Sequence, residues 1–419
     1  MPPPFSASFL LTFALVEASP GPKPQGPPPC AVATVDPYTR GEREPLQRAG
    51  YESFGPFPFC MNHDSAAVAA LLPEEPIAWI ETAHFRLGAS LSPLRLDDRN
   101  QQPTLRAELK TLASKLPGVD PKTRDLDPWL RAHLFAQRLE RIHAEVSAVL
   151  QVDDEAFSKT PSDPIAETTF MGLGPHFGMK EKFTVLLLRD GAHLRRFTAA
   201  FHGIATSEPS RQFDHALGCG FFGAAETSVH GTLAKDRAMH ANVAYHTAAL
   251  LYVSYRSYCH DVPAWVIDGL AHDHARAVAT DVPIHVSTDL ESATAEYTQW
   301  DSLWRSRLAE GRFDSSTEWL EGTNQSALTD EQRLQAWAFV RHLRSIDPTA
   351  FPTFFRRLKD PFHRRLRFPT LEELAERQRS AWQEAFGATA REQFAAWQKQ
   401  PLRKEKKRTT KTTASLRSR

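Results

Sequence analysis

Three side chains near the middle of the chain, His246, Asp268 and His272, have the types and spacing to hold a metal ion. Asp268 and His272 are four residues apart in a segment with a helical pattern, so they are expected on one face of a helix. Zinc accepts imidazole and carboxylate ligands together, and three protein ligands with an open position for water can make a hydrolytic centre. The residues therefore allow a zinc-dependent hydrolase or peptidase with His246, Asp268 and His272 as ligands.

The segment around Asp268 resembles part of a metallopeptidase family. Residues 263–271 read PAWVIDGLA, which is similar to the P-x-W-[LV]-x-E-G-[LF]-A segment of the gluzincins, the group of thermolysin-like enzymes and zinc aminopeptidases. In that family the segment opens the helix that carries the third zinc ligand, a Glu. The resemblance implies that Asp268 stands at that ligand position. Residues 243–251, VAYHTAALL, then stand where the family has V-x-H-E-x-x-H.

The H-E-x-x-H motif itself is absent from residues 243–251. A gap of about 18 residues to the third ligand puts Tyr245 and Ala249 at the two histidine positions and His246 at the catalytic Glu. A shift by one residue puts His246 at the first ligand, Thr247 at the base and Leu250 at the second ligand. Neither alignment contains a histidine pair or a general base, which zinc peptidase chemistry requires.

This loss predicts a catalytically inactive metallopeptidase-like protein that acts as a binding or structural module, with a peptide or protein as its unidentified ligand. No catalytic residue and no cofactor are expected, although zinc remains possible through the rebuilt ligand set. A further alternative is a structural protein whose groove is filled by its own side chains. The residues expected to line the vestigial site are Tyr245, His246, Trp265, Asp268 and His272.

The two segments predict helices over residues 239–255 and 264–278 that pack side by side, with His246 facing Asp268. The small side chains of Gly269 and Ala271 would permit the close approach, and Trp265 is expected to be buried. His246 shares a helical stripe with apolar residues, which favours a position in the core. In the alternative without metal, His272 and His274 would be surface residues.

The resemblance extends over residues 77–400 and implies an α+β, two-lobed fold. Residues 77–87 are similar to an opening strand and 183–190 to the next strand. Residues 218–223 resemble a glycine-rich edge strand beside the site helix. The expected divisions are an irregular segment at 19–75, a gluzincin-like α/β lobe at 76–300 and a helical lobe at 301–400.

Other segments carry local helix signals. Residues 105–116 and 128–150 are expected to be helical, with His133 and His143 lying off the apolar stripe of the second helix and therefore solvated. Capping boxes predict three helix starts in the last third of the chain. These pairs are Thr329 with Gln332, Thr370 with Glu373, and Thr389 with Glu392.

The chain ends and composition bear on location. Residues 1–18 contain an apolar run and a small-residue cleavage site, which predicts a signal peptide and an exported or cell-envelope protein; otherwise the protein would be cytoplasmic. If the protein is exported, its four cysteines could form two disulfides in three pairings, of which Cys30–Cys60 with Cys219–Cys259 is preferred.

The net charge of zero argues against a nucleic-acid partner for the core. The basic tail at 401–419 is expected to be disordered and could contact anionic surfaces. No segment is apolar and long enough to predict a transmembrane helix in the mature chain.

Overall fold

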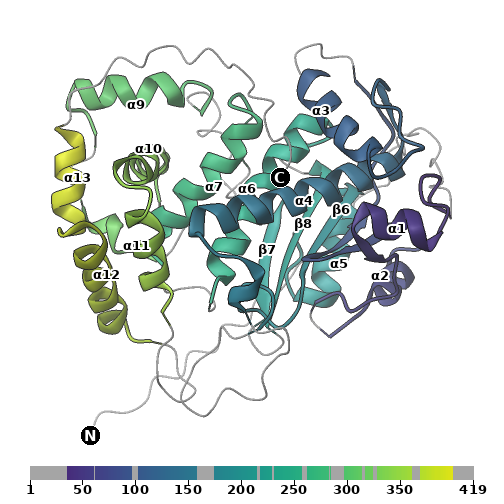
Figure 1. Ribbon diagram of the computed structural model, residues 1–419, viewed down its shortest axis with the longest axis horizontal. Coiled ribbons are helices and arrows are strands. Elements are labelled where there is room, and N and C mark those ends of the chain that lie inside the picture. Colours follow the sequence, from purple (N-terminus) through teal and green to yellow (C-terminus); the bar gives the residue numbers. More distant parts are fainter. Residues whose placement is uncertain are drawn as a thin grey trace, which may run out of the picture. The chain divides into compact units, whose positions relative to one another are not determined.

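The computed structural model describes residues 35–60, 62–96, 102–157, 174–214, 218–228, 231–256, 262–282, 284, 297–313, 317–323, 328–360 and 369–399. All of them belong to one compact unit, Val32–Arg419. The fold is α+β: a mixed sheet with helices on both faces is followed by a mainly helical C-terminal part (Figure 1).

The strands are short except for two in the centre of the sheet. Their bounds are β1 Tyr51–Ser53, β2 Ala78–Thr82, β3 Phe85–Ala89, β6 Phe183–Asp190, β7 Ser210–Asp214, β8 Cys219–Ser228 and β9 Gly231–Thr232, with β4 Leu94–Arg95 and β5 Asp125–Leu126 forming a separate pair. The order across the sheet is β1-β2-β3-β6-β8-β7, and β9 pairs with β8. β3, β6 and β8 run parallel, while the strands outside them are antiparallel to their neighbours.

The helices before the site are α1 Arg43–Ala49, α2 Ser65–Leu71, α3 Gln102–Ala113, α4 Pro128–Leu150 and α5 Gly191–His202, and η1 Asp154–Ala156 is a short 3-10 helix. The site helices are α6 Asp236–Ser254 and α7 Ala264–Val278. The C-terminal part contains α9 Trp300–Ala309, η2 Glu318–Leu320, α10 Asp330–Ile346, α11 Ala350–Leu358, α12 Leu371–Phe386 and α13 Ala390–Gln398.

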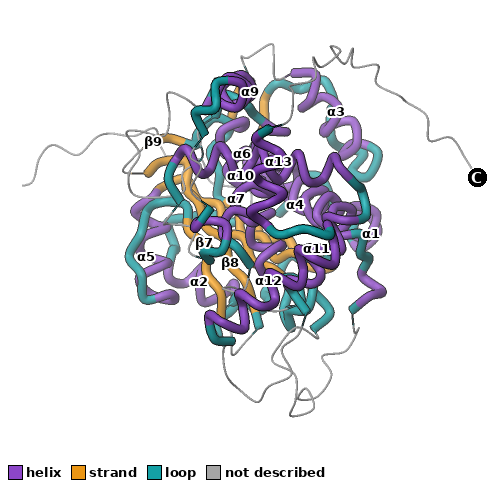
Figure 2. The backbone as a smooth tube through the Cα atoms, turned by 90° about the vertical axis from the view of Figure 1, so that its left-hand side faces the viewer, coloured by secondary structure: helices purple, strands orange, loops and turns teal. Residues whose placement is uncertain are grey.

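Strand β6 shows how the core is organised. It is buried along nearly its whole length, and successive side chains point to opposite faces of the sheet. Val185 and Leu187 join the large core under α4 and α6, whereas Leu186 and Leu188 join a smaller core with α2 and α5. Figure 2 shows α5 and α4 on opposite sides of the strands. A strand covered on both faces has a nearly continuous apolar sequence, as residues 183–188 do with Thr184 as the one polar residue.

Several local features differ from the sequence-based expectations. Residues 77–87 form a hairpin of β2 and β3 rather than one strand. The strand at 219–228 is not at the edge, because β8 pairs with β6 on one side and β7 on the other. Residues 35–75 were expected to be irregular, yet they form α1, β1 and α2, and β1 extends the sheet.

The three predicted helix starts are confirmed. Thr329, Thr370 and Thr389 are the N-cap residues of α10, α12 and α13, and each forms a complete capping box with the Gln or Glu three positions later. Each box satisfies backbone N–H groups that the first helical turn leaves without a partner, which explains why such starts can be recognised locally.

Candidate functional site

Helices α6 and α7 pack side by side, as predicted, and Trp265 anchors the start of α7. Pro263 is the N-cap residue of α7. Trp265 is fully buried, and its indole Nε1 donates a hydrogen bond to the Leu320 carbonyl at 2.9 Å. Its ring packs against Phe339 and Trp382 of the C-terminal helices. The predicted burial of Trp265 is therefore confirmed, and this side chain ties the site helices to the C-terminal part.

The side chain that reaches Asp268 from α6 comes from Tyr245, whereas His246 was expected there. The Tyr245 hydroxyl donates to Asp268 Oδ1 at 2.6 Å. The His246 ring instead stacks on Phe222 of β8, with centroids 4.8 Å apart and planes at 12°. Neighbouring residues on a helix point about 100° apart, so one position decides which side chain faces α7. The expected core position of His246 is confirmed, because it is only 3% exposed.

Asp268 lies in a buried ionic network. Arg333 of α10 contacts the same carboxylate oxygen at 2.5 Å, and Asp268 has no exposed surface. The Arg211 guanidinium, from β7, lies 5.8 Å from the centre of the Tyr245 ring. Burial disfavours the charged carboxylate, but Arg333, followed by His272 and Tyr245, outweighs it and holds the pKa of Asp268 below its usual value. Burial and the Asp268 charge raise the pKa of Tyr245 well above its usual value, so its hydroxyl remains a donor.

His272 is buried next to Asp268, and the expectation that His272 and His274 are surface residues is wrong. The His272 Nε2 atom lies 3.5 Å from Asp268 Oδ2, and neither atom has a hydrogen-bond partner among the described residues. Burial lowers the pKa of His272 to about 4, although Asp268 opposes the shift, so the ring is neutral at pH 7. His274 bonds Tyr252 and Glu145 instead.

These contacts limit the chemistry that the predicted site can perform. Asp268 Oδ2 and His272 Nε2 are the two atoms placed to share a cation, whereas a catalytic zinc needs three protein ligands. Two guanidinium groups, Arg333 and Arg211, act on the Asp268 carboxylate and would repel a divalent ion. The only acidic residue of α6 is Asp236, its first residue, nine positions before Tyr245, so no carboxylate on this helix stands next to Tyr245 as a general base near Asp268.

A second group of potential metal ligands lies elsewhere. Among the residues that the structure describes, the only set of three whose ligand atoms all come within 4.8 Å of one another is His84, His143 and Asp154. The sequence prediction that His143 and His133 are solvated is wrong, since they are 4% and 0% exposed. Helix α4 contacts the sheet, α3, α6 and α11, so even the face away from its apolar stripe is covered.

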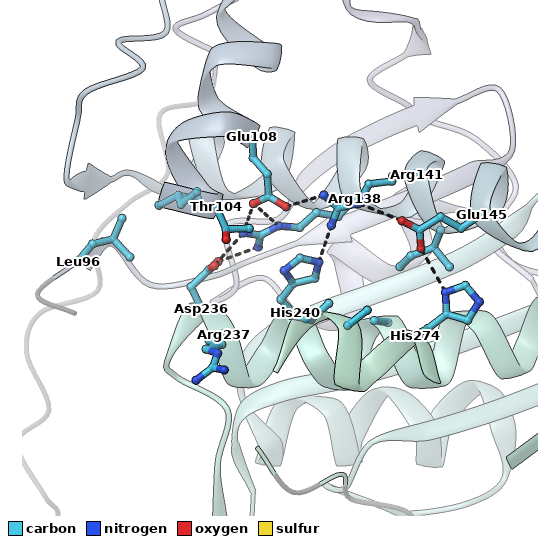
Figure 3. Close-up of a pocket in the computed structure, with 15 residues that line it drawn as sticks. Leu96, Thr104, Glu108, Arg138, Arg141, Glu145, Asp236, Arg237, His240 and His274 are labelled. Atoms are coloured by element: carbon cyan, nitrogen blue, oxygen red, sulfur yellow. Dashed lines mark hydrogen bonds and ion pairs between the residues drawn. The ribbon is translucent and has the colours of Figure 1, made fainter. Parts of the chain in front are cut away.

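A cavity of about 360 Å³, lined by both charged and apolar side chains, lies between α3, α4, α6 and α7 (Figure 3). Arg138 bridges Glu108 and Asp236, with its Nη2 atom 2.7 and 2.8 Å from their carboxylates. Arg141 contacts Glu108 and His240. These charges are neutralised within the wall of the cavity. Sequence analysis missed it because the charged residues come from three separate helices, and no local spacing joins them.

Several predictions fall outside the described residues. These include the signal peptide, the basic tail, and Cys30 and Cys259, so the disulfide pairing remains a prediction; Cys60 and Cys219 are buried. Within the described ranges, no helix combines the length and the apolar character needed to cross a membrane.

Comparison with known proteins found no relative of this chain. No protein-family model matches the chain, and neither the curated proteins nor the solved structures contain a match. The resemblance to gluzincins therefore stays a prediction from the sequence motifs alone.

Proposed function

We propose that the chain is a metallopeptidase-like protein without peptidase activity, which acts as a structural or binding module. One observation carries this proposal: Asp268, which the gluzincin resemblance puts at the position of the third zinc ligand, accepts hydrogen bonds from Tyr245 and Arg333 on one carboxylate oxygen. In this interpretation a tyrosine–aspartate–arginine network replaces the metal ion between the two site helices.

Burial favours the structural role over a peptide-binding groove at this place. Tyr245 and Asp268 have no exposed surface, and His272 and His246 are 2% and 3% exposed. A substrate-binding centre must admit its ligand, whereas a buried, hydrogen-bonded polar network instead orients the helices that contain it. Arg333 belongs to α10, so the network joins the α/β part to the C-terminal helices.

The alternative is a zinc-dependent hydrolase with His246, Asp268 and His272 as ligands. The observation in its favour concerns two buried atoms, Asp268 Oδ2 and His272 Nε2. They lie 3.5 Å apart, and neither has a hydrogen-bond partner among the described residues. Against it stand the stacking of His246 on Phe222 and the two guanidinium groups that act on Asp268.

A peptidase assay separates the two proposals. The purified chain is treated with a chelator, reloaded with zinc and incubated with a broad peptide library. We expect no cleavage, and Asp268→Asn should behave as the parent does. Cleavage that stops on chelation and is lost in Asp268→Asn, but kept in Asp273→Asn on the same helix, would establish the hydrolase instead. Circular dichroism confirms that each variant is folded.

A further inference from the structure

Three segments bring His84, His143 and Asp154 together. His84 lies in the turn between β2 and β3, His143 lies in the last third of α4, and Asp154 begins η1 just after α4. The ligand atoms of the three side chains all lie within 4.8 Å of one another. This cluster is separate from the Asp268 network, and neither the gluzincin resemblance nor the proposed function assigns a role to it.

His84 is oriented in the way that metal-binding histidines usually are. Its Nδ1 atom hydrogen-bonds Glu140 Oε2 at 2.7 Å, and its backbone N–H donates to Glu140 Oε1 at 3.1 Å. The Nε2 atom is thereby directed toward Asp154, whose Oδ2 atom is 3.0 Å away. A carboxylate on the second ring nitrogen fixes the tautomer and orientation of a metal ligand and raises its basicity.

His143 supplies an independent observation. Its side chain is 5% exposed, and its Nε2 atom has no hydrogen-bond partner among the described residues. The nearest carboxylate oxygen, Asp154 Oδ1, lies 4.0 Å away, which is too far for a hydrogen bond. A buried polar atom without a partner costs free energy. A cation bound between His143 and Asp154 would give the His143 nitrogen a partner.

The ring geometry defines what binding must change. The His84 and His143 rings are stacked, with centroids 3.6 Å apart and planes at 14°. Nitrogen lone pairs lie in the ring planes, so both rings can meet one ion only if they turn out of this stack. Zinc binds histidine nitrogen at about 2.0–2.1 Å and combines two histidines with one carboxylate and a water molecule. Asp154 has a side chain that is 60% exposed, so solvent and ions reach the cluster.

We propose that His84, His143 and Asp154 bind one zinc ion, with Glu140 as the positioning residue of His84. The ion would fasten the β2–β3 turn to the end of α4. None of these residues belongs to the α6–α7 pair.

Zinc binding is measured on the full chain by competition with a chromophoric chelator, after metal has been removed. We expect one equivalent, lost in His143→Gln and in the surface variant Asp154→Asn. Glu140→Gln should bind about 10- to 100-fold more weakly. His193→Gln is the matched control, because His193 also lies between two carboxylates, at 2.6 and 3.0 Å from Glu75 and Glu74, but forms no such three-ligand set. It should bind zinc as the parent does.

The outcomes separate this site from the proposed function. Loss of zinc in Asp154→Asn but not in Asp268→Asn or His193→Gln supports the site and leaves the inactive-peptidase proposal intact. Absence of stoichiometric zinc in the parent, or equal affinity in the parent and Asp154→Asn, would overturn the site alone. Zinc lost only in Asp268→Asn would overturn both proposals. Asp154→Asn changes a mostly exposed side chain, so its folding gives a fair test even if His143→Gln proves unstable.

Discussion

Replacing Arg333 by methionine tests the buried network most sharply. The substitution removes the cation and leaves Asp268 fully buried, with the Tyr245 hydroxyl still bound to Oδ1. Removing one partner of a buried ion pair costs about 3–5 kcal/mol, because the remaining charge is uncompensated. We therefore expect Arg333→Met to lower the free energy of unfolding by about that amount.

The same two helices provide a matched control. Arg344 of α10 contacts Asp273 of α7 at 2.5 Å, but these side chains are 33% and 29% exposed. Partly exposed pairs typically contribute about 0–1 kcal/mol, because solvent screens them. Arg344→Met should thus lose only a small amount. Both ion pairs join α10 to α7, so the difference in unfolding free energy between the two variants reports the effect of burying the pair.

Guanidinium chloride unfolding gives the free energies, provided that the slope of the transition is unchanged. In Arg333→Met, adding Asp268→Asn removes the uncompensated charge and should recover part of the loss. Two results would refute the account of the network. One is an equally small loss of unfolding free energy in Arg333→Met and Arg344→Met. The other is a double variant, Arg333→Met with Asp268→Asn, whose loss equals the sum of the losses of the two single variants.

Three further changes have defined outcomes. Trp265→Ala should destabilise by about 3–5 kcal/mol, as large-to-small changes in cores do, and a thermal melt that hardly moves would contradict its anchoring role. Gly269→Ala should cost about 1–3 kcal/mol, measured by chemical unfolding, because the added Cβ would lie 2.6 Å from the Ala336 carbonyl oxygen of α10; a neutral change would show that α7 and α10 can separate. His272 stays neutral in the folded chain down to about pH 4, whereas the unfolded chain binds a proton below about pH 6.5, so stability falls as the pH falls through this window. At pH 5 the protonation of His272 in the unfolded chain lowers the free energy of unfolding by about 2 kcal/mol. The variant His272→Gln lacks this group, so its free energy of unfolding should fall by correspondingly less between pH 7 and pH 5.

Gly269 also illustrates what the sequence could predict about the site. The small residues of α7 indicated a close helix approach, and such an approach exists, but at Gly269 the neighbour is α10 rather than α6. Helical periodicity and the Pro–Trp start identified the two helices and their pairing. The side chain of α6 that meets α7 depends on the rotation of the helix about its axis, which apolar spacing alone does not fix. The prediction therefore placed His246 opposite Asp268, where the structure has Tyr245.

Long-range partners could not be predicted from spacing. Arg333 is 65 positions from Asp268, and no local pattern links them. His143 was predicted to be exposed because it lies off the apolar stripe of α4. Other elements cover this helix on several sides, so residues outside the stripe are buried as well. The capping boxes were recognised correctly because their hydrogen bonds close within four residues.

A zinc-soaked crystal examined by anomalous diffraction at the zinc edge tests the central claim most directly. The account predicts no zinc peak between Asp268 and His272, and continuous density joining Asp268 to Tyr245 and Arg333. A peak at about 2.0–2.2 Å from both Asp268 Oδ2 and His272 Nε2, with Arg333 displaced, would contradict it and make the zinc-dependent hydrolase the better account.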